Sequence, residues 1–293
     1  MERIKLTPQE IAARFKIRCS AILDICAGEI GLTEKQQLKY DTLIQRAKDF
    51  KNGVAKVKDL TDIMKSELSE LQFKKDNPEL PEGAKTYCKK WLKEFLYKRR
   101  AEIKSKYLDK GNQCEEDGFT LMCLELNLGM VYKNTEYFEN EYICGTPDLF
   151  VRKIVYDNKC SYSLDTFPMF ETENPKPEYE WQLNGYAELL KTDDAVLAYT
   201  LIDAPNDIIS REVKWLIDPN DIYNKLCDLI YTKDNFVKAV SEYCPDSTAD
   251  HFIEIPQEER IVKFEFKKDQ SKINKVNERV PMCREYIISL LTK

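Results

Sequence analysis

The segment "GTPDLFVRKIVYDNKCS", residues 145–161, constrains the fold of this chain more than any other stretch. Two short runs of apolar, aromatic and β-branched residues flank Arg152 and Lys153, a pattern that predicts a β-hairpin with its turn at this pair. Asp148 opens one arm of the hairpin, and Asp157 lies near the end of the other. The folded hairpin therefore brings both carboxylates to the same edge of a sheet.

Alternation along the second arm determines which side chains act together. Alternate residues of a strand share a face, so Asp157 and Lys159 point the same way and Asn158 points away. Two carboxylates and the Asn158 backbone carbonyl suit the oxygen-only octahedron of Mg²⁺, and a nearby lysine can position water or stabilise a charged phosphodiester. An acid-x-Lys triplet by itself arises by chance about six times in a chain of this composition. An ordinary hairpin with surface charges is the alternative.

The acid-x-Lys triplet becomes evidence for an active site only through the order of the features around it. Upstream, Glu115 begins a helical apolar stripe in "NQCEEDGFTLMCLEL", and a carboxylate in that position needs a partner. Downstream, Gln182 and Tyr186 lie four residues apart and share one face of the helix predicted for "PEYEWQLNGYAELL". A Q-x-x-x-Y pair alone is most often a chance polar pair. A helical Glu, two acidic strands and this helix in sequence are hard to obtain by accident.

The distribution of predicted elements indicates the fold class. The first 110 residues have the pattern of helices, and Thr33 with Gln36 forms a capping-box signature. Strands are predicted at 129–134, 136–145, 147–151, 153–159, 195–205, 211–217 and 259–268, and helices at 177–190, 219–243 and the C-terminus. This mixture predicts an α/β fold, a restriction-endonuclease-like central mixed sheet flanked by helices. We expect a helical, basic N-terminal region at 1–106 as part of the same globule. A core with a C-terminal strand and helix follows at 107–293.

Composition excludes several classes of protein and site. The chain has ten cysteines but no C-x-x-C, so we expect reduced thiols and no iron–sulfur cluster. A single histidine, His251, excludes a His-rich metal site. Residues 1–110 carry 25 Lys/Arg against 17 Asp/Glu and the remainder 20 against 34, which indicates either a phosphate-binding wall beside an acidic centre or ordinary surface charge. No apolar run suits a membrane span or a signal peptide, so we expect a cytoplasmic protein with no membrane partner.

These motifs resemble the PD-(D/E)xK nuclease superfamily, and within it the phage lambda exonuclease and YqaJ-type recombination nucleases. "KGNQCEED" is similar to that group's Gly-x-x-x-Glu helix start, "TPDL" to its Ser-Pro-Asp-Gly segment, "DNKCS" to its Glu-Leu-Lys-Cys-Pro segment, and "QLNGY" to its Gln-centred helix. The resemblance covers about Gly111 to Trp215. Two positions depart from the group: Asp157 replaces its usual glutamate, and Leu149 stands where it has glycine.

The resemblance implies a metal centre held by oxygen. Asp148, Asp157 and the backbone carbonyl of Asn158 would bind the first Mg²⁺, for which Mn²⁺ can substitute. Glu115 would help to hold the centre and a second ion. Lys159 would assist the water that attacks the phosphodiester.

The resemblance also implies residues that hold DNA. Gln182 and Tyr186 would brace the site and the DNA backbone and belong to the catalytic set. "RFKIRCSAI" resembles the segment that grips a 5′-phosphate in the family, with Arg18 and Ser20 as the best candidates and Arg14 next.

The function implied is that of a Mg²⁺-dependent 5′→3′ exodeoxyribonuclease acting on linear double-stranded DNA. Its product would be a 3′ single-stranded tail for an annealing protein in phage-type recombination, and the family also implies a ring-shaped trimer. The alternatives are a RecB-like single-strand nuclease, an endonuclease of the same superfamily, and a catalytically inactive DNA-binding relative.

Overall fold

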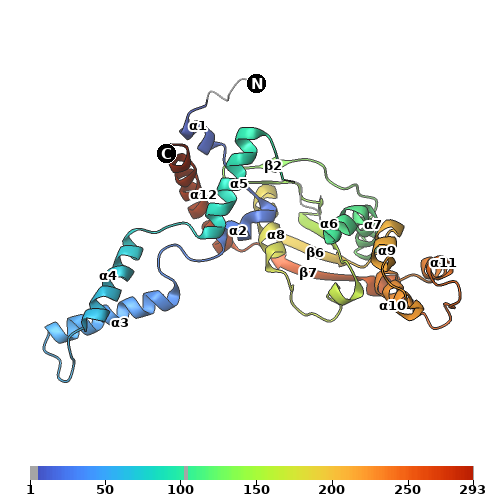
Figure 1. Ribbon diagram of the computed structural model, residues 1–293. Coiled ribbons are helices and arrows are strands. Elements are labelled where there is room, and N and C mark those ends of the chain that lie inside the picture. The colour runs from blue at the N-terminus through green and yellow to red at the C-terminus, as the bar shows by residue number, and fades with distance from the viewer. Residues whose placement is uncertain (1–5, 102–104, 293) are drawn as a thin grey trace. The chain divides into compact units, whose positions relative to one another are not determined.

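The structure is a computed structural model that describes residues 6–101 and 105–292. The α-helices are α1 (Pro8–Ala13), α2 (Ile22–Cys26), α3 (Glu34–Lys51), α4 (Asp62–Asp76), α5 (Glu82–Tyr97), α6 (Lys106–Gln113), α7 (Glu115–Glu125), α8 (Pro177–Leu190), α9 (Asn206–Val213), α10 (Pro219–Leu229), α11 (Lys233–Tyr243) and α12 (Gln270–Leu291). The strands are β1 (Ile17–Arg18), β2 (Phe138–Glu139), β3 (Ile143–Gly145), β4 (Leu149–Val151), β5 (Ile154–Cys160), β6 (Asp194–Thr200) and β7 (Ile261–Lys267) (Figure 1). Single 3-10 turns lie at Cys19–Ala21, Leu164–Thr166 and Gln257–Arg260.

The chain divides into two compact units. One contains the described parts of Met1–Phe15, Leu23–Arg99 and Asn274–Lys293, and the other contains Lys16–Ile22 and Arg100–Ile273. The first unit is helical, and the second contains both sheets. Most of the C-terminal helix α12, from Asn274 onward, therefore belongs to the helical unit, although the sequence pattern placed it with the core.

A four-stranded mixed sheet forms the centre of the second unit. Its strand order is β4-β5-β6-β7, with β5 and β6 parallel and both outer pairs antiparallel. Helix α8 connects the parallel pair, as a parallel connection requires, and packs against both strands. Figure 1 shows α8 beside β6. The α/β class and the mixed sheet flanked by helices are confirmed.

The predicted hairpin forms between β4 and β5. Val151 pairs with Ile154, and Arg152 and Lys153 between them have φ angles of 52° and 63°. Two successive left-handed residues are the conformation of a type I′ turn, whose twist matches that of the strands it joins. The turn therefore forms without glycine, at the pair that the sequence indicates, and it sets the register of the two acidic residues.

Several expected elements differ from the structure, among them residues 136–145, which form the antiparallel strands β2 and β3 instead of one strand. Residues 129–134 form an irregular loop, because Asn127 and Gly129 have positive φ and turn the chain away after α7. Residues 211–217 begin as the last turn of α9 and continue as a loop, with Val213 buried in a helical cluster. Residues 219–243 form two helices instead of one.

Asp203 explains the break between α10 and α11. Its carboxylate accepts hydrogen bonds from the backbone amides of Tyr231 and Thr232, at 2.6 and 3.3 Å, and from Asn235 at 2.7 Å. These bonds fix an extended segment where the sequence pattern alone continues as a helix.

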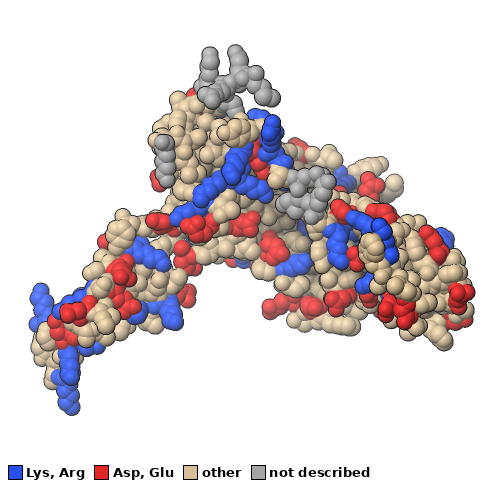
Figure 2. Space-filling view, in the orientation of Figure 1, with Lys and Arg blue, Asp and Glu red and all other residues tan. Residues whose placement is uncertain are grey.

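The helical unit keeps its own small core. In α3 the Thr33 hydroxyl accepts from the Gln36 amide and the Gln36 side chain accepts from Thr33, which confirms the capping box. Leu43, Leu60 and Leu71 pack between α3 and α4. Figure 2 shows Lys and Arg side chains gathered over α5, whose exposed residues include Lys89, Lys90 and Lys93. No helix of the described residues has the length and apolar character of a membrane span.

Helix α7 approaches β5 closely at Gly118. A Cβ atom there would lie 2.5 Å from Asn158 Nδ2, 2.5 Å from Cys160 Sγ and 2.7 Å from Thr200 Oγ1. The Thr200 hydroxyl also donates to Asn158 Oδ1 at 3.0 Å, so these neighbours are held in place. Only glycine fits here, and it lets α7 cover the sheet face that carries Asn158.

We expect Gly118→Ala to destabilise the protein by about 1–3 kcal/mol, the usual cost of overpacking a filled interior. Gly111→Ala is the matched control, since Gly111 also lies in a helix and a Cβ there would meet nothing within 4 Å. The control should be unchanged or more stable by up to about 1 kcal/mol. Urea unfolding of the three proteins measures both effects. Equal stability of the two variants would contradict the close packing of α7 on β5.

Candidate active site

The β4–β5 hairpin places Asp148 across from Asp157. The register pairs Leu149 with Tyr156, so Asp148 faces Asp157 one step further along the ladder. The Asn158 amide donates to Asp148 Oδ2 at 2.9 Å, which fixes the first carboxylate against the second arm. Burial, and then the neighbouring Asp157, raise the pKa of Asp148 to about 6. The structure confirms that both carboxylates meet at one edge of the sheet.

Lys159 neutralises part of this charge. Its ammonium lies 2.6 Å from Asp157 Oδ2, and Asp157 itself is almost fully buried. Burial disfavours the charged lysine, but the carboxylates of Asp157 and Asp148 outweigh it, so the pKa of Lys159 is raised. The amine therefore stays protonated at neutral pH. Asp157 and Lys159 share a face, as alternation along β5 predicts.

Helix α8 supplies the polar residues behind the aspartate. Gln182 Nε2 donates to Tyr186 Oη at 2.9 Å and lies 3.4 Å from Asp157 Oδ1. Both side chains are buried, and burial followed by the charge of Asp157 raises the pKa of the Tyr186 hydroxyl. Gly145 allows this approach, because a Cβ there would lie 2.7 Å from the Tyr186 ring. Gln182 and Tyr186 thus brace Asp157, as the shared helix face predicts.

Glu115 forms an ion pair, as a carboxylate at the head of an apolar helix face requires. Lys133, in the loop after α7, forms an ion pair with Glu115, and its Nζ lies 3.7 Å from Asp148 Oδ1. The lysine therefore connects the helical glutamate to the hairpin aspartate. Sequence reasoning missed Lys133, because it lies in a segment whose pattern indicated a strand and it belongs to no motif.

The two aspartates fit a divalent cation. Their oxygens are of the type that Mg²⁺ prefers, and burial followed by the charge of Asp157 raises the pKa of Asp148, an unfavourable charge that a bound cation would relieve. Among the described residues no three acidic, cysteine or histidine side chains gather into a ready metal cluster. Glu115 would join the aspartates only if Lys133 moved away. The carbonyl of Asn158 as a ligand and a second ion stay predictions.

The expected 5′-phosphate residues lie on two different units. Arg18 ends β1, which pairs with β3, and Ser20 is exposed in the following 3-10 turn. That turn packs against α8, where a Cβ on Gly185 would lie 2.8 Å from Cys19 Sγ. Arg18 and Ser20 thus lie on the segment that supports the helix of Gln182. Arg14 is the C-cap of α1 in the helical unit, and its role stays a prediction.

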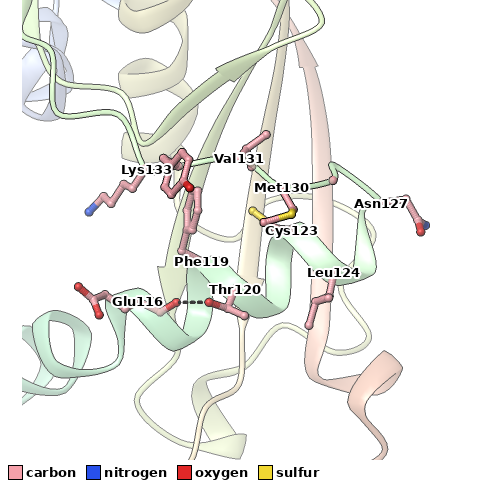
Figure 3. A pocket seen from close by; sticks show the side chains of 11 residues that line it. Glu116, Phe119, Thr120, Cys123, Leu124, Asn127, Met130, Val131 and Lys133 are labelled. Carbon is pink, nitrogen blue, oxygen red and sulfur yellow. Dashed lines mark hydrogen bonds between the residues drawn. The ribbon is translucent and has the colours of Figure 1, made fainter.

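An open apolar groove of about 670 Å³ lies beside the site. Figure 3 shows Phe119 on α7 pointing toward the loop that carries Met130, Val131 and Lys133. Met130 is 98% exposed, so the loop presents an apolar side chain to solvent. The apolar residues of 129–134 therefore line a groove, which explains why their pattern did not produce a strand.

Comparison with solved structures identifies the same fold. A phage-related exonuclease from Haemophilus somnus 129PT superposes with a TM-score of 0.61 at 24% identity, covering 95% of this chain and 96% of that chain. An alkaline exonuclease from Laribacter hongkongensis gives a TM-score of 0.49 at 11% identity, covering 94% and 91%. No protein-family model and no curated protein matches the chain. The Haemophilus structure confirms that this chain has the fold of the exonuclease group that its motifs resemble.

Proposed function

We propose that this protein is a Mg²⁺-dependent deoxyribonuclease, a 5′→3′ exonuclease acting on linear double-stranded DNA. One observation carries the proposal: the hairpin brings Asp148, Asp157 and Lys159 together, and Gln182 of α8 lies against the second aspartate. The fold shared with a phage-related exonuclease supports the same activity. This arrangement of acid, acid and lysine suits hydrolysis of a phosphodiester.

The positions of the site residues indicate a different role for each of them in cleavage. Asp148 and Asp157 would hold the ion, which when bound polarises a phosphoryl oxygen and lowers the pKa of water. Lys159 keeps its proton and is placed to donate to an oxygen of the scissile phosphate or to orient the attacking water. Gln182 and Tyr186 are positioning residues, because Gln182 touches Asp157 and Tyr186 accepts a hydrogen bond from Gln182.

The proposed 5′→3′ polarity depends on a phosphate-binding role for the segment that packs against α8. Arg18 and Ser20 would bind the terminal 5′-phosphate, with Arg14 as a further candidate. Digestion from that end leaves a 3′ single-stranded tail, which suits an annealing protein and phage-type recombination. A trimeric ring is part of the same proposal.

End labels test the polarity and the preference for ends. A linear duplex with a 5′-phosphate and different labels at its two ends should lose the 5′ label first, and a closed circle should stay intact. Loss of the 3′ label first would reverse the polarity. Cutting of the circle would make the protein an endonuclease, and digestion of single strands alone would favour a RecB-like activity.

Removal of Lys133 should strengthen cation binding. Its ammonium contacts Glu115 and lies near Asp148, where a divalent ion would compete with it. Because the pair is partly exposed, we expect Lys133→Met to tighten Mg²⁺ binding by about three- to tenfold, the equivalent of about 0.7–1.4 kcal/mol. Calorimetric titration with Mg²⁺ in the absence of DNA measures this.

Lys263→Met is the matched control for that titration, since Lys263 pairs with Glu265 on the surface of β7. The control should bind Mg²⁺ as the unaltered protein does. Weaker binding by Lys133→Met would show that Lys133 holds the carboxylates in place for the ion instead of competing with it.

A further inference from the structure

A pocket of about 450 Å³ adjoins the candidate active site. Lys159 lines it, so the pocket opens next to the ammonium that would face the scissile phosphate. Four tyrosines contribute to its lining: Tyr107, Tyr162, Tyr179 and Tyr199. Its volume lies within the range of about 300–1,000 Å³ typical of small-molecule sites.

The tyrosine rings form two contacting pairs. The centroids of Tyr107 and Tyr162 are 4.8 Å apart, and those of Tyr179 and Tyr199 are 6.1 Å apart. Lys159 Nζ lies 5.0 Å from the centre of the Tyr179 ring, which ties one pair directly to the catalytic lysine. Flat aromatic surface beside a phosphate-binding cation suits a planar heterocycle attached to a phosphate.

Ser161 adds an unused polar group to this pocket. The residue is 6% exposed and lines the pocket, and its hydroxyl has no hydrogen-bond partner in the structure. Its backbone amide donates to the carbonyl of Thr200 at 2.8 Å. Buried hydroxyls normally have a partner, so this hydroxyl at the cavity wall offers a hydrogen-bonding position that a bound ligand can fill. The edge of a nucleobase carries suitable donors and acceptors.

Packing of the protein alone does not account for this lining. Tyr199 is buried and its hydroxyl donates to Asn174, which is an ordinary structural role. Tyr107, in contrast, is 58% exposed in the first turn of α6, where a polar residue would serve the fold as well. The Tyr107 ring contacts Tyr162 edge-on and lies 5.7 Å from Lys106 Nζ, yet more than half of the residue stays exposed in the same pocket as Ser161, which leaves aromatic surface for a stacking partner.

We propose that this pocket holds the base of the nucleotide whose phosphate lies at Lys159. The proposal rests on the nuclease function proposed above and adds a subsite to it. The rings of Tyr107 and Tyr179 would stack on the base, and the Ser161 hydroxyl would hydrogen-bond its edge. Stacking accepts every base, whereas the serine favours bases with a suitable group at that edge.

Binding without cleavage tests the subsite. In EDTA, calorimetry compares deoxyguanosine 5′-monophosphate with 2-deoxyribose 5-phosphate, which lacks the base. The nucleotide should bind at least about tenfold more tightly, and Tyr107→Leu should remove about five- to tenfold of that preference without changing binding of the sugar phosphate. Ser161→Ala should weaken nucleotide binding about threefold or more.

Tyr132→Leu is the matched control, because Tyr132 is 87% exposed and lines the other groove. It should bind both probes as the unaltered protein does, and circular dichroism verifies that each variant folds. Equal affinity for the two probes, or identical behaviour of Tyr107→Leu and Tyr132→Leu, would overturn the proposal.

A second assay separates failure of the subsite from failure of the nuclease. The scissile phosphate at Lys159 would be the 5′-phosphate of the second residue of the digested strand. A linear duplex in which this second residue is abasic should therefore lose its terminal nucleotide about tenfold more slowly than one with an intact base there. Equal rates would overturn the subsite and leave the nuclease in place. If the protein bound the nucleotide more tightly than the sugar phosphate but cut no DNA, the proposed subsite would stand and the proposed nuclease activity would be wrong.

Discussion

Replacement of Lys159 by methionine should lower the rate of DNA cleavage by about 10²–10³-fold, the usual effect of removing one preorganised donor from an active site. Methionine keeps the length of the stem and removes only the charge that lies 2.6 Å from Asp157 Oδ2. Binding of duplex DNA should change far less. Single-turnover cleavage of an end-labelled duplex in Mg²⁺, together with a DNA-binding titration in EDTA, measures both quantities.

The same substitution should destabilise the metal-free protein. The side chain of Asp157 is 3% exposed, and loss of Lys159 leaves its buried charge without its partner. Breaking a buried ion pair in this way costs about 3–5 kcal/mol, part of which bound Mg²⁺ should restore. Lys263→Met, which removes an exposed lysine from β7, should change neither cleavage nor stability. Full cleavage activity of Lys159→Met would remove this lysine from the mechanism.

Replacement of Asp148 by asparagine should strongly slow cleavage and yet stabilise the metal-free protein at neutral pH. Burial and then Asp157 raise the pKa of Asp148 to about 6, so the charged form is disfavoured in the folded state. Asparagine preserves the shape and can still accept a hydrogen bond from the Asn158 amide. Loss of one of the two carboxylates that hold the ion should lower the cleavage rate by about 10²-fold or more.

The pH dependence follows from the direction of the shift. Between the unfolded pKa near 4 and the folded value of about 6, the folded state binds the proton more tightly, so the contribution of Asp148 to stability falls as pH rises. The destabilisation caused by the buried charge of Asp148 is absent below about pH 4 and complete above about pH 6, where it amounts to about 2–3 kcal/mol. The free energy of unfolding of Asp148→Asn should therefore equal that of the unaltered protein at pH 4 and exceed it at pH 8.

Urea unfolding in EDTA at pH 4, 6 and 8 measures this difference. Asp194→Asn is the matched control, because Asp194 is only partly buried and pairs with the exposed Lys267. Its stability should differ little from that of the unaltered protein at any of the three values. If Asp148→Asn were the less stable protein at pH 8, the two aspartates would not be under electrostatic strain.

The hairpin and its acids could be predicted because local rules determine them. The apolar runs around Arg152 and Lys153 place the turn, the turn sets the register, and the register places Asp148 against Asp157. Alternation along β5 then brings Lys159 to the face of Asp157, and the four-residue spacing on α8 brings Gln182 beside Tyr186. Each step depends on neighbours in the sequence or on one strand pairing.

Features that depend on distant contacts could not be predicted. Lys133 reaches Glu115 only because α7 ends and the loop after it turns back, which no motif records. Asp203 divides 219–243 into two helices through bonds to a segment about thirty residues away. The exposed loop at Met130 has the apolar residues of a strand, yet it lines a groove. In each case tertiary contacts override the local pattern.

Release of nucleotides from a uniformly labelled linear duplex, followed as Mg²⁺ is titrated, tests the central claim most directly. We expect release that requires Mg²⁺ or Mn²⁺, stops on addition of EDTA and is lost in a protein carrying Asp157→Asn. No release from duplex or single-stranded DNA with either ion would contradict the account. The protein would then have the fold of an exonuclease without its chemistry.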